Sequence, residues 1–80
     1  MEKLKLGIYK HFKGNLYEVI ALARDSETKE EMVVYKALYI HEEFGKDSIW
    51  VRPLKMFTEH VKRDGYSGPR FVYVKEKKNN

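Results

Sequence analysis

Two segments of this 80-residue chain constrain its fold more than any other. The first, Gly7–Val19, has the aromatic and β-branched residues of two strands, with Gly14-Asn15 between them. The second, Ile49–Phe57, is strand-like as far as Pro53, which has no N–H to donate to a sheet ladder. Proline also presets φ for a helical turn, which we expect over Pro53–Phe57. Together the segments predict a small β-barrel or barrel-like sheet with one short helical turn.

Alternating apolar residues predict the remaining elements of the fold. We expect a two-residue type II′ turn at Gly14-Asn15, because glycine accepts the positive φ that this turn requires. That turn places His11 opposite Glu18 in the neighbouring strand. We expect five strands, over Gly7–Phe12, Leu16–Arg24, Glu31–Tyr39, Ser48–Arg52 and Arg70–Val74. The prediction is an all-β, SH3-like barrel of five to six strands that forms one domain over residues 1–74, followed by a disordered basic tail over residues 75–80.

The composition limits how such a domain holds together. A core of this size contributes only about 3–5 kcal/mol of net stability. Cysteine is absent, so disulfides and thiolate metal sites are excluded. The core therefore depends on aromatic residues, and the sequence has one Trp, six Tyr and four Phe. No apolar run approaches the roughly 18 residues of a membrane span, and no signal-peptide pattern follows Met1, so we expect a cytoplasmic protein.

The net charge of +4 is unevenly placed along the chain. The tail Lys75–Asn80 has three lysines and one glutamate, which leaves +2 for residues 1–74. Nucleic-acid-binding domains usually concentrate basic residues on one face and have a pI above about 9. The pI of this chain is about 9.3, and the tail accounts for much of it. The weak charge of the body therefore favours a protein partner over nucleic acid.

Five motifs occur in order along the chain and together carry a family resemblance. They are Gly-Ile-Tyr-x-His-x-Lys-Gly-x-x-Tyr-Glu-Val, Ala-Arg-x-Ser-Glu-Thr, Val-Val-Tyr-x-Ala-Leu-Tyr, Trp-Val-Arg-Pro-Leu-x-Met-Phe and Pro-Arg-Phe. The set resembles the bacterial family named domain of unknown function 1653, and it covers Gly7–Val74, nearly the whole chain. The resemblance implies a compact bacterial β-domain, and it implies no particular activity.

Side chains suited to catalysis are few, and each has a structural alternative. His11 opposite Glu18 would make an acid–base pair if both lined a pocket, although cross-strand pairs of this kind also occur as surface complements. No cysteine, nucleophilic serine motif or glycine-rich phosphate loop is present. The spacing of the candidate metal ligands matches no standard site: His11, His41, His60, Glu42, Glu43 and Glu59. We therefore expect no metal, no cofactor and no enzymatic activity, with catalysis by His11 and Glu18 as the third hypothesis.

Binding is the better supported class of function, and its candidates surround the junction at Pro53. Aromatic rings stack on planar groups, and Arg or Lys side chains hold anions. The candidate ligand-binding residues are Tyr9, His11, Glu18, Trp50, Arg52, Lys55 and Arg70. Two of them have a structural alternative: Arg52 as a strut to Glu18 or Glu59, and Trp50 as a core residue. The apolar residues after Pro53 have one as well, because they would plug the open end of a barrel: Leu54, Met56 and Phe57.

These observations leave two classes of binding protein. We expect a small non-catalytic module whose partner is a protein, recruited by an aromatic face or by an exposed sheet edge. Such an edge would also allow a homodimer. The alternative is a module that binds RNA or single-stranded DNA through its aromatic and basic residues. No membrane partner is expected.

Overall fold

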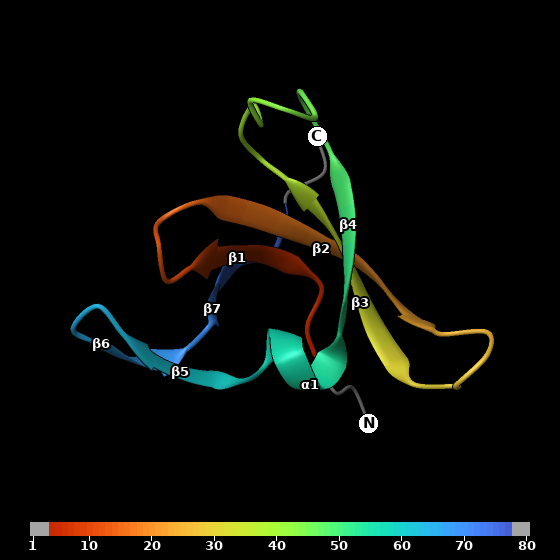
Figure 1. Ribbon diagram of the computed structural model, residues 1–80. Coiled ribbons are helices and arrows are strands. Elements are labelled where there is room, and N and C mark those ends of the chain that lie inside the picture. Colours follow the sequence, from red (N-terminus) through yellow and green to blue (C-terminus); the bar gives the residue numbers. More distant parts are fainter. Residues whose placement is uncertain (1–3, 78–80) are drawn as a thin grey trace.

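The computed structural model describes residues 4–77, which form seven strands and one short helix (Figure 1). The elements are β1 (Gly7–His11), β2 (Leu16–Arg24), β3 (Glu31–Ala37), β4 (Ile49–Pro53), α1 (Leu54–Phe57), β5 (His60–Arg63), β6 (Tyr66–Pro69) and β7 (Phe71–Lys75). The predicted all-β class is confirmed only in its coarser form, as a mostly-β fold, and the helical turn after Pro53 is confirmed.

The strands form an open sheet and a separate hairpin. Five strands pair in the order β4-β3-β2-β1-β7, all antiparallel, and β5 pairs with β6. Within residues 4–77, β4 and β7 lie at the two edges of the large sheet and do not pair with each other, so the closed ring of a barrel is not formed. Figure 1 shows instead a curved sheet with α1 across one end and the β5–β6 hairpin beside β7.

One face of the large sheet, here called the inner face, carries the hydrophobic core. Its buried members come from four strands and from α1: Tyr9, Val19, Val33, Tyr35, Phe57 and Phe71. Phe57 is only 1% exposed, and Leu54 packs against the cluster, so both cover the inner face of the open sheet instead of plugging the end of a barrel. Met56 is 45% exposed, and the prediction that it belongs to the plug is wrong.

The first hairpin has a different register from the predicted one. Tyr9 pairs with Tyr17, and Ile8 pairs with Glu18. The His11 N–H donates to the Asn15 carbonyl at 2.8 Å, which leaves a three-residue loop instead of a two-residue turn. Hairpin register follows loop length, so the predicted pairing of His11 with Glu18 is wrong. His11 lies on the inner face beside Phe71, and Glu18 lies on the opposite, outer face.

The long β2–β3 hairpin is confirmed, with one irregularity. The register shifts between Val19 and Ala21, so Ile20 is an extra residue in β2. A bulge of this kind reverses which face the following side chains occupy. At the hairpin tip, the Asp25 carboxylate accepts bonds from the backbone N–H groups of Glu27 and Thr28, at 2.8 and 3.1 Å. These bonds lower the pKa of Asp25.

The β5–β6 hairpin was not predicted from the sequence. Its turn contains Asp64 and Gly65, which have φ values of 53° and 80°. Positive φ at both central residues defines a type I′ turn, and Asp-Gly is a favoured pair for it. The hairpin is joined to the main sheet through Arg70, whose N–H donates to the Glu59 carbonyl at 2.9 Å and whose carbonyl accepts from the Phe12 N–H at 2.9 Å.

The described part of the tail follows the sheet. Strand β7 runs to Lys75, which pairs with Ile8 in β1. The Lys77 Nζ lies 3.2 Å from the Glu18 carboxylate on the outer face. The predicted disorder of the tail also concerned residues 78–80, which lie outside the described residues. No helix between residues 4 and 77 has the length and apolar character needed to cross a membrane.

Candidate binding pocket on the inner face

A pocket of about 210 Å³ opens on the inner face, next to the core. Its lining comes from β2, β3, β4 and the loop after β3: Tyr17, Tyr35, Tyr39, His41, Trp50 and Arg52. Strand pairing explains why β4 contributes two of these side chains. Trp50 lies opposite Tyr35, and Arg52 lies opposite Val33, so both point to the inner face. The pocket therefore combines one cation with an aromatic wall.

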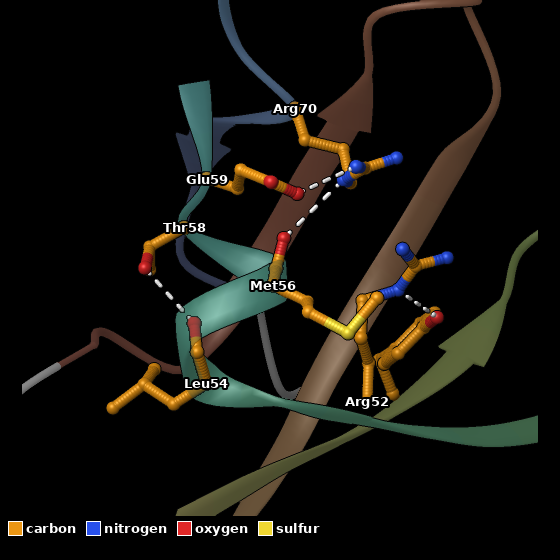
Figure 2. A network of polar contacts seen from close by, with 7 residues as sticks. Arg52, Leu54, Met56, Thr58, Glu59 and Arg70 are labelled. Atoms are coloured by element: carbon orange, nitrogen blue, oxygen red, sulfur yellow. Dashed lines mark hydrogen bonds and ion pairs between the residues drawn. The ribbon is translucent and has the colours of Figure 1, made fainter. Parts of the chain in front are cut away.

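Arg52 is held by one edge of its guanidinium group. Its Nε–H donates to the Tyr35 hydroxyl at 3.2 Å, and the group lies 5.7 Å from the ring centre of Phe71. Figure 2 shows the two terminal nitrogens pointing away from that hydroxyl. Among residues 4–77, no carboxylate lies within 4.0 Å of Arg52, so the predicted strut to Glu18 or Glu59 is wrong. An arginine oriented in this way can donate two hydrogen bonds to the oxygens of a carboxylate or phosphate.

Two tyrosines form one side of the pocket. The hydroxyls of Tyr17 and Tyr39 lie 3.0 Å apart and share a hydrogen bond. Burial and this hydrogen bond both raise the pKa of Tyr17, so its phenol stays neutral at physiological pH. The ring of Tyr17 also meets those of Tyr35 and Tyr39 edge to face, at centroid distances of 5.3 and 5.6 Å. These contacts fix the orientation of the three tyrosine rings that form this side of the pocket.

The loop after β3 closes on itself and presents His41 and Phe44. His41 and Gly45 exchange two backbone hydrogen bonds of 2.9 and 2.8 Å. The His41 Nδ1 accepts from the backbone N–H groups of Glu43 and Phe44 at 3.0 and 3.2 Å. Gly45 has a φ of 77°, a left-handed conformation that glycine adopts without strain. The rim of the pocket is therefore ordered by its own backbone.

Trp50 is half-buried, between the core and the loop. Its ring lies 5.7 Å from that of His41 and 5.3 Å from that of Phe44. The indole N–H donates to the Ser48 hydroxyl at 2.8 Å. The structure thus places Trp50 at the boundary between the two predicted roles, because it packs against the core cluster and also lines the pocket.

Arg70 ties α1 to the β5–β6 hairpin. Its guanidinium group donates to the Met56 carbonyl at 3.2 Å and pairs with the Glu59 carboxylate at 2.8 Å (Figure 2). The Met56 carbonyl belongs to the last turn of α1 and also accepts the Glu59 backbone N–H at 3.3 Å. Arg70 therefore has a structural task, and it also adds positive charge beside the pocket.

His11 lies on the inner face, between the pocket and the β5–β6 hairpin. Its ring is 6.4 Å from that of Tyr17 and 4.9 Å from that of Phe71. Its Nδ1 accepts from the Lys13 N–H at 3.1 Å, so the neutral ring carries its proton on Nε2. Burial lowers the pKa of His11 most, and the positive charges of four neighbours lower it further: Arg52, Arg70, Lys13 and Arg63. The ring is therefore neutral at pH 7 in a region of positive potential.

The structure brings together four of the seven candidate residues from the sequence: His11, Trp50, Arg52 and Arg70. Tyr9 is a core residue, 4% exposed. Lys55 is exposed on α1, away from the pocket lining. Glu18 lies on the outer face, where it pairs with Lys36 and Lys77 at 3.6 and 3.2 Å.

Sequence reasoning missed four lining residues: Tyr17, Tyr35, Tyr39 and His41. Alternation within β2 and within β3 places Tyr17 and Tyr35 on the inner face, whereas Tyr39 lies beyond the end of β3. That signal was present but was interpreted only as core. Within residues 4–77, no group of three or more His, Asp or Glu side chains is arranged to hold a metal ion.

Comparison with known proteins agrees with the fold. The family model described as protein of unknown function (DUF1653) matches residues 7–73. No curated protein matches the chain. The crystal structure of a DUF1653 protein from Bordetella bronchiseptica is 34% identical in sequence and superimposes with a TM-score of 0.83. That match covers 100% of this chain and 99% of the Bordetella chain. The sequence motifs, the sheet order and these matches agree, and the chain belongs to the DUF1653 family.

Proposed function

We propose that the protein is a non-catalytic binding module whose inner-face pocket holds an anionic group of its partner. The observation that carries the proposal is the state of Arg52. Its Nε–H is engaged by Tyr35, and within residues 4–77 no carboxylate neutralises the group. Guanidinium groups that lack an internal acid and face a pocket are suited to binding carboxylate or phosphate in a bidentate manner.

The size and lining of the pocket define what accompanies the anion. A volume of about 210 Å³ is smaller than the roughly 300–1,000 Å³ of pockets for drug-sized ligands. It suits one side chain or one planar ring of a larger partner. Trp, Tyr and Arg are the residues that most often dominate binding energy at interfaces. Trp50, Tyr17 and Arg52 therefore support a role as the anchoring point for a macromolecule.

Two observations support binding over catalysis. The acid–base pair that was considered for an enzyme would require His11 and Glu18 to share a face, and they lie on opposite faces. The neutral His11 instead offers an Nε2–H donor. The SH3-like barrel named from the sequence remains part of this proposal: we regard the curved sheet, closed at one end by α1, as an open relative of those binding barrels.

The two partner classes from the sequence fit the pocket differently. An acidic segment of a partner protein would supply a carboxylate to Arg52. A nucleic acid would supply a phosphate, and it is favoured by the four cationic side chains whose charges reach His11. The low net charge of the chain favours a protein as the partner. The positive charge gathered around His11 supports nucleic acid as an equally good candidate.

The test is an amide NMR titration that includes the side-chain signals of Arg52 and Trp50. Inorganic phosphate and a short Asp/Glu-rich peptide serve as separate probes. We expect saturable shifts at the Arg52 Nε–H and the Trp50 indole N–H with at least one probe. Arg52→Gln should abolish the shift of the Trp50 indole N–H. Lys10→Gln deletes the same charge from the outer face of β1 and leaves both shifts unchanged. Shifts that are absent, or a Trp50 shift that persists in Arg52→Gln, would contradict the proposal.

A further inference from the structure

The pocket is the middle part of a longer chain of aromatic rings. On one side, the ring of Tyr17 contacts that of Tyr39 at 5.6 Å, and Tyr39 contacts His41 at 6.3 Å. His41 then meets Trp50 at 5.7 Å, and Trp50 meets Phe44 at 5.3 Å. The series runs from β2 to the closed loop after β3 and ends at its tip. Phe44 is 56% exposed there and presents its ring to solvent.

The chain of rings continues on the other side of the pocket. Tyr17 contacts His11 at 6.4 Å, and His11 contacts Phe12 at 4.6 Å. Phe12 stacks on Tyr66 of the β5–β6 hairpin, with centroids 5.4 Å apart and an interplanar angle of 17°. We call the continuous series from Phe44 to Tyr66 the aromatic track. It joins three separate parts of the fold: the loop after β3, the main sheet and the small hairpin.

The aromatic track is distinct from the aromatic core. The core rings are all buried: Tyr9, Tyr35, Phe57 and Phe71. Each ring of the track is half-buried or exposed. Rings needed only for packing are normally covered in a small domain, where buried area is scarce. A contiguous series of accessible rings is typical of a surface that meets a ligand.

Cationic groups accompany the middle and one end of the track. Arg52, Arg70, Lys13 and Arg63 all act electrostatically on His11, which lies between the pocket and Phe12. The Lys13 Nζ is also 6.0 Å from the ring centre of Phe12. Glu59 offsets the charge of Arg70, and Arg52 has no such counter-ion within residues 4–77. Positive charge is thus concentrated where the track crosses the sheet, although the total charge of the chain is modest.

We infer that single-stranded nucleic acid lies along the aromatic track, with a phosphate at Arg52 and bases on the rings to either side. The inference rests on the proposed function, because it uses the same pocket for the anion. A polymer that repeats a planar ring and a negative charge matches a surface that alternates rings and cations. A duplex does not fit this role, because its bases are stacked on each other. An acidic peptide would use Arg52 but has no planar group for Phe12 and Phe44.

The experiment measures binding of single-stranded oligouridylates of increasing length, from two to eight nucleotides, by fluorescence anisotropy and amide NMR. We expect affinity to rise with length until the track is covered, and shifts to spread from Arg52 to Phe12 and Phe44. An abasic phosphodiester of the same length and charge is the matched control probe. It tests the bases, and we expect it to bind more weakly by at least about 5- to 150-fold, the factor that corresponds to the loss of one stacked base.

Two variants test the ends of the track. Phe44→Leu and Phe12→Leu each keep an apolar side chain and remove an aromatic face. Each should weaken the longer oligonucleotides by about 5- to 150-fold and leave the binding of inorganic phosphate unchanged. Lys10→Gln is the control for the outer face. Arg52→Gln should weaken every oligonucleotide and reduce the slope of log affinity against log salt by about 1.

The outcomes separate the two proposals. Equal binding of the abasic probe, or shifts confined to the pocket at every length, would overturn the nucleic-acid inference. Binding of phosphate or the acidic peptide at Arg52, without length-dependent oligonucleotide binding, would overturn it as well and leave the proposed function in place. If no probe shifts the Arg52 signal, both proposals are overturned. Spectra of each variant without ligand confirm that the fold is retained.

Discussion

The rings of Phe57 and Phe71 lie parallel, with centroids 4.0 Å apart and planes that differ by 4°. Phe57 is the last residue of α1, and Phe71 is the first of β7. Their contact therefore connects the helix to one edge of the sheet, and Arg70 strengthens the connection through the Met56 carbonyl. This arrangement holds α1 against the inner face even though the helix has only one turn.

The stack predicts an order of stability losses. Phe57→Ala removes a fully buried ring and should lower the free energy of unfolding by about 3–5 kcal/mol. Trp50→Ala should cost less, because Trp50 is half-buried, and still more than Lys10→Gln on the outer face. Urea denaturation followed by circular dichroism gives all three values. If Phe57→Ala leaves too little folded protein to measure, the free energy of unfolding of Phe57→Leu is compared with that of the other variants instead. A larger loss for Trp50→Ala than for Phe57→Ala would contradict this assignment of the core.

Two glycines with positive φ should respond differently to substitution. A Cβ at Gly7 would lie 2.7 Å from the Lys75 carbonyl oxygen, while a Cβ at Gly45 would have open space. Gly45→Ala should cost about 1–2 kcal/mol, the strain of the left-handed region. Gly7→Ala should cost more, because the pairing of β1 with β7 must also open. Thermal denaturation of the two variants side by side measures the difference, and equal losses would contradict the close approach of the strands.

Tyr35 is expected to act as a positioning residue for Arg52. Tyr35→Phe removes the hydroxyl that accepts the Arg52 Nε–H and keeps the buried ring. The loss of one hydrogen bond should lower stability by about 0.5–1.5 kcal/mol. Affinity for the anionic probe should fall several-fold, because the guanidinium group is no longer fixed. The NMR signal of the Arg52 Nε–H distinguishes this effect from a purely structural one, since it should move in the unliganded variant.

The stability of the protein should depend on His11 in mildly acidic solution. The pKa of His11 is below its ordinary value of 6.5 in the folded state, mainly because of burial and then because of the Arg52 charge. The unfolded chain therefore binds a proton first as pH falls, and stability is lost below about pH 6.5. Above that pH the contribution of His11 is fully present. Protonation would also break the bond from the Lys13 N–H to Nδ1.

The measurement compares unfolding of the native protein and of His11→Gln between pH 7.5 and pH 5. The native protein should lose more stability over this range than the variant, which has no group to titrate at that position. Carboxylates contribute to both proteins, so the difference isolates His11. Identical pH profiles would contradict the lowered pKa.

Much of the fold was predictable because strand alternation is a local signal. The long strand Leu16–Arg24 was predicted with its observed bounds, and the turn after Pro53 follows from proline itself. The predicted register of the first hairpin was wrong because its loop has three residues instead of two, and a difference of one residue in loop length shifts the entire register. The β5–β6 hairpin was not predicted, for another reason. Its strands have only four residues each and are mostly polar, so the Asp64-Gly65 turn was the main sign of it in the sequence.

The site was less predictable than the fold. Arg52 and Trp50 were recognised because they adjoin the strand-to-turn junction at Pro53, and their common parity in β4 then places both on the inner face. Tyr39 and His41 lie beyond the end of β3, where parity no longer applies. Their position depends on the hydrogen bonds of the loop and on the Tyr17 hydroxyl, neither of which has a sequence signature. Glu18 was misplaced by the register error that paired it with His11.

The closed loop between His41 and Gly45 has a consequence for how members of this family can diverge. Because its hydrogen bonds are made by its own backbone and by one histidine ring, the residues at its tip contribute nothing to the pairing of β3 with β4. Substitutions at Phe44 therefore remove ring contacts with His41 and Trp50 but leave the strand pairing intact. The tip of the loop, which belongs to the proposed binding surface, can therefore change in sequence while the pairing of the sheet is kept.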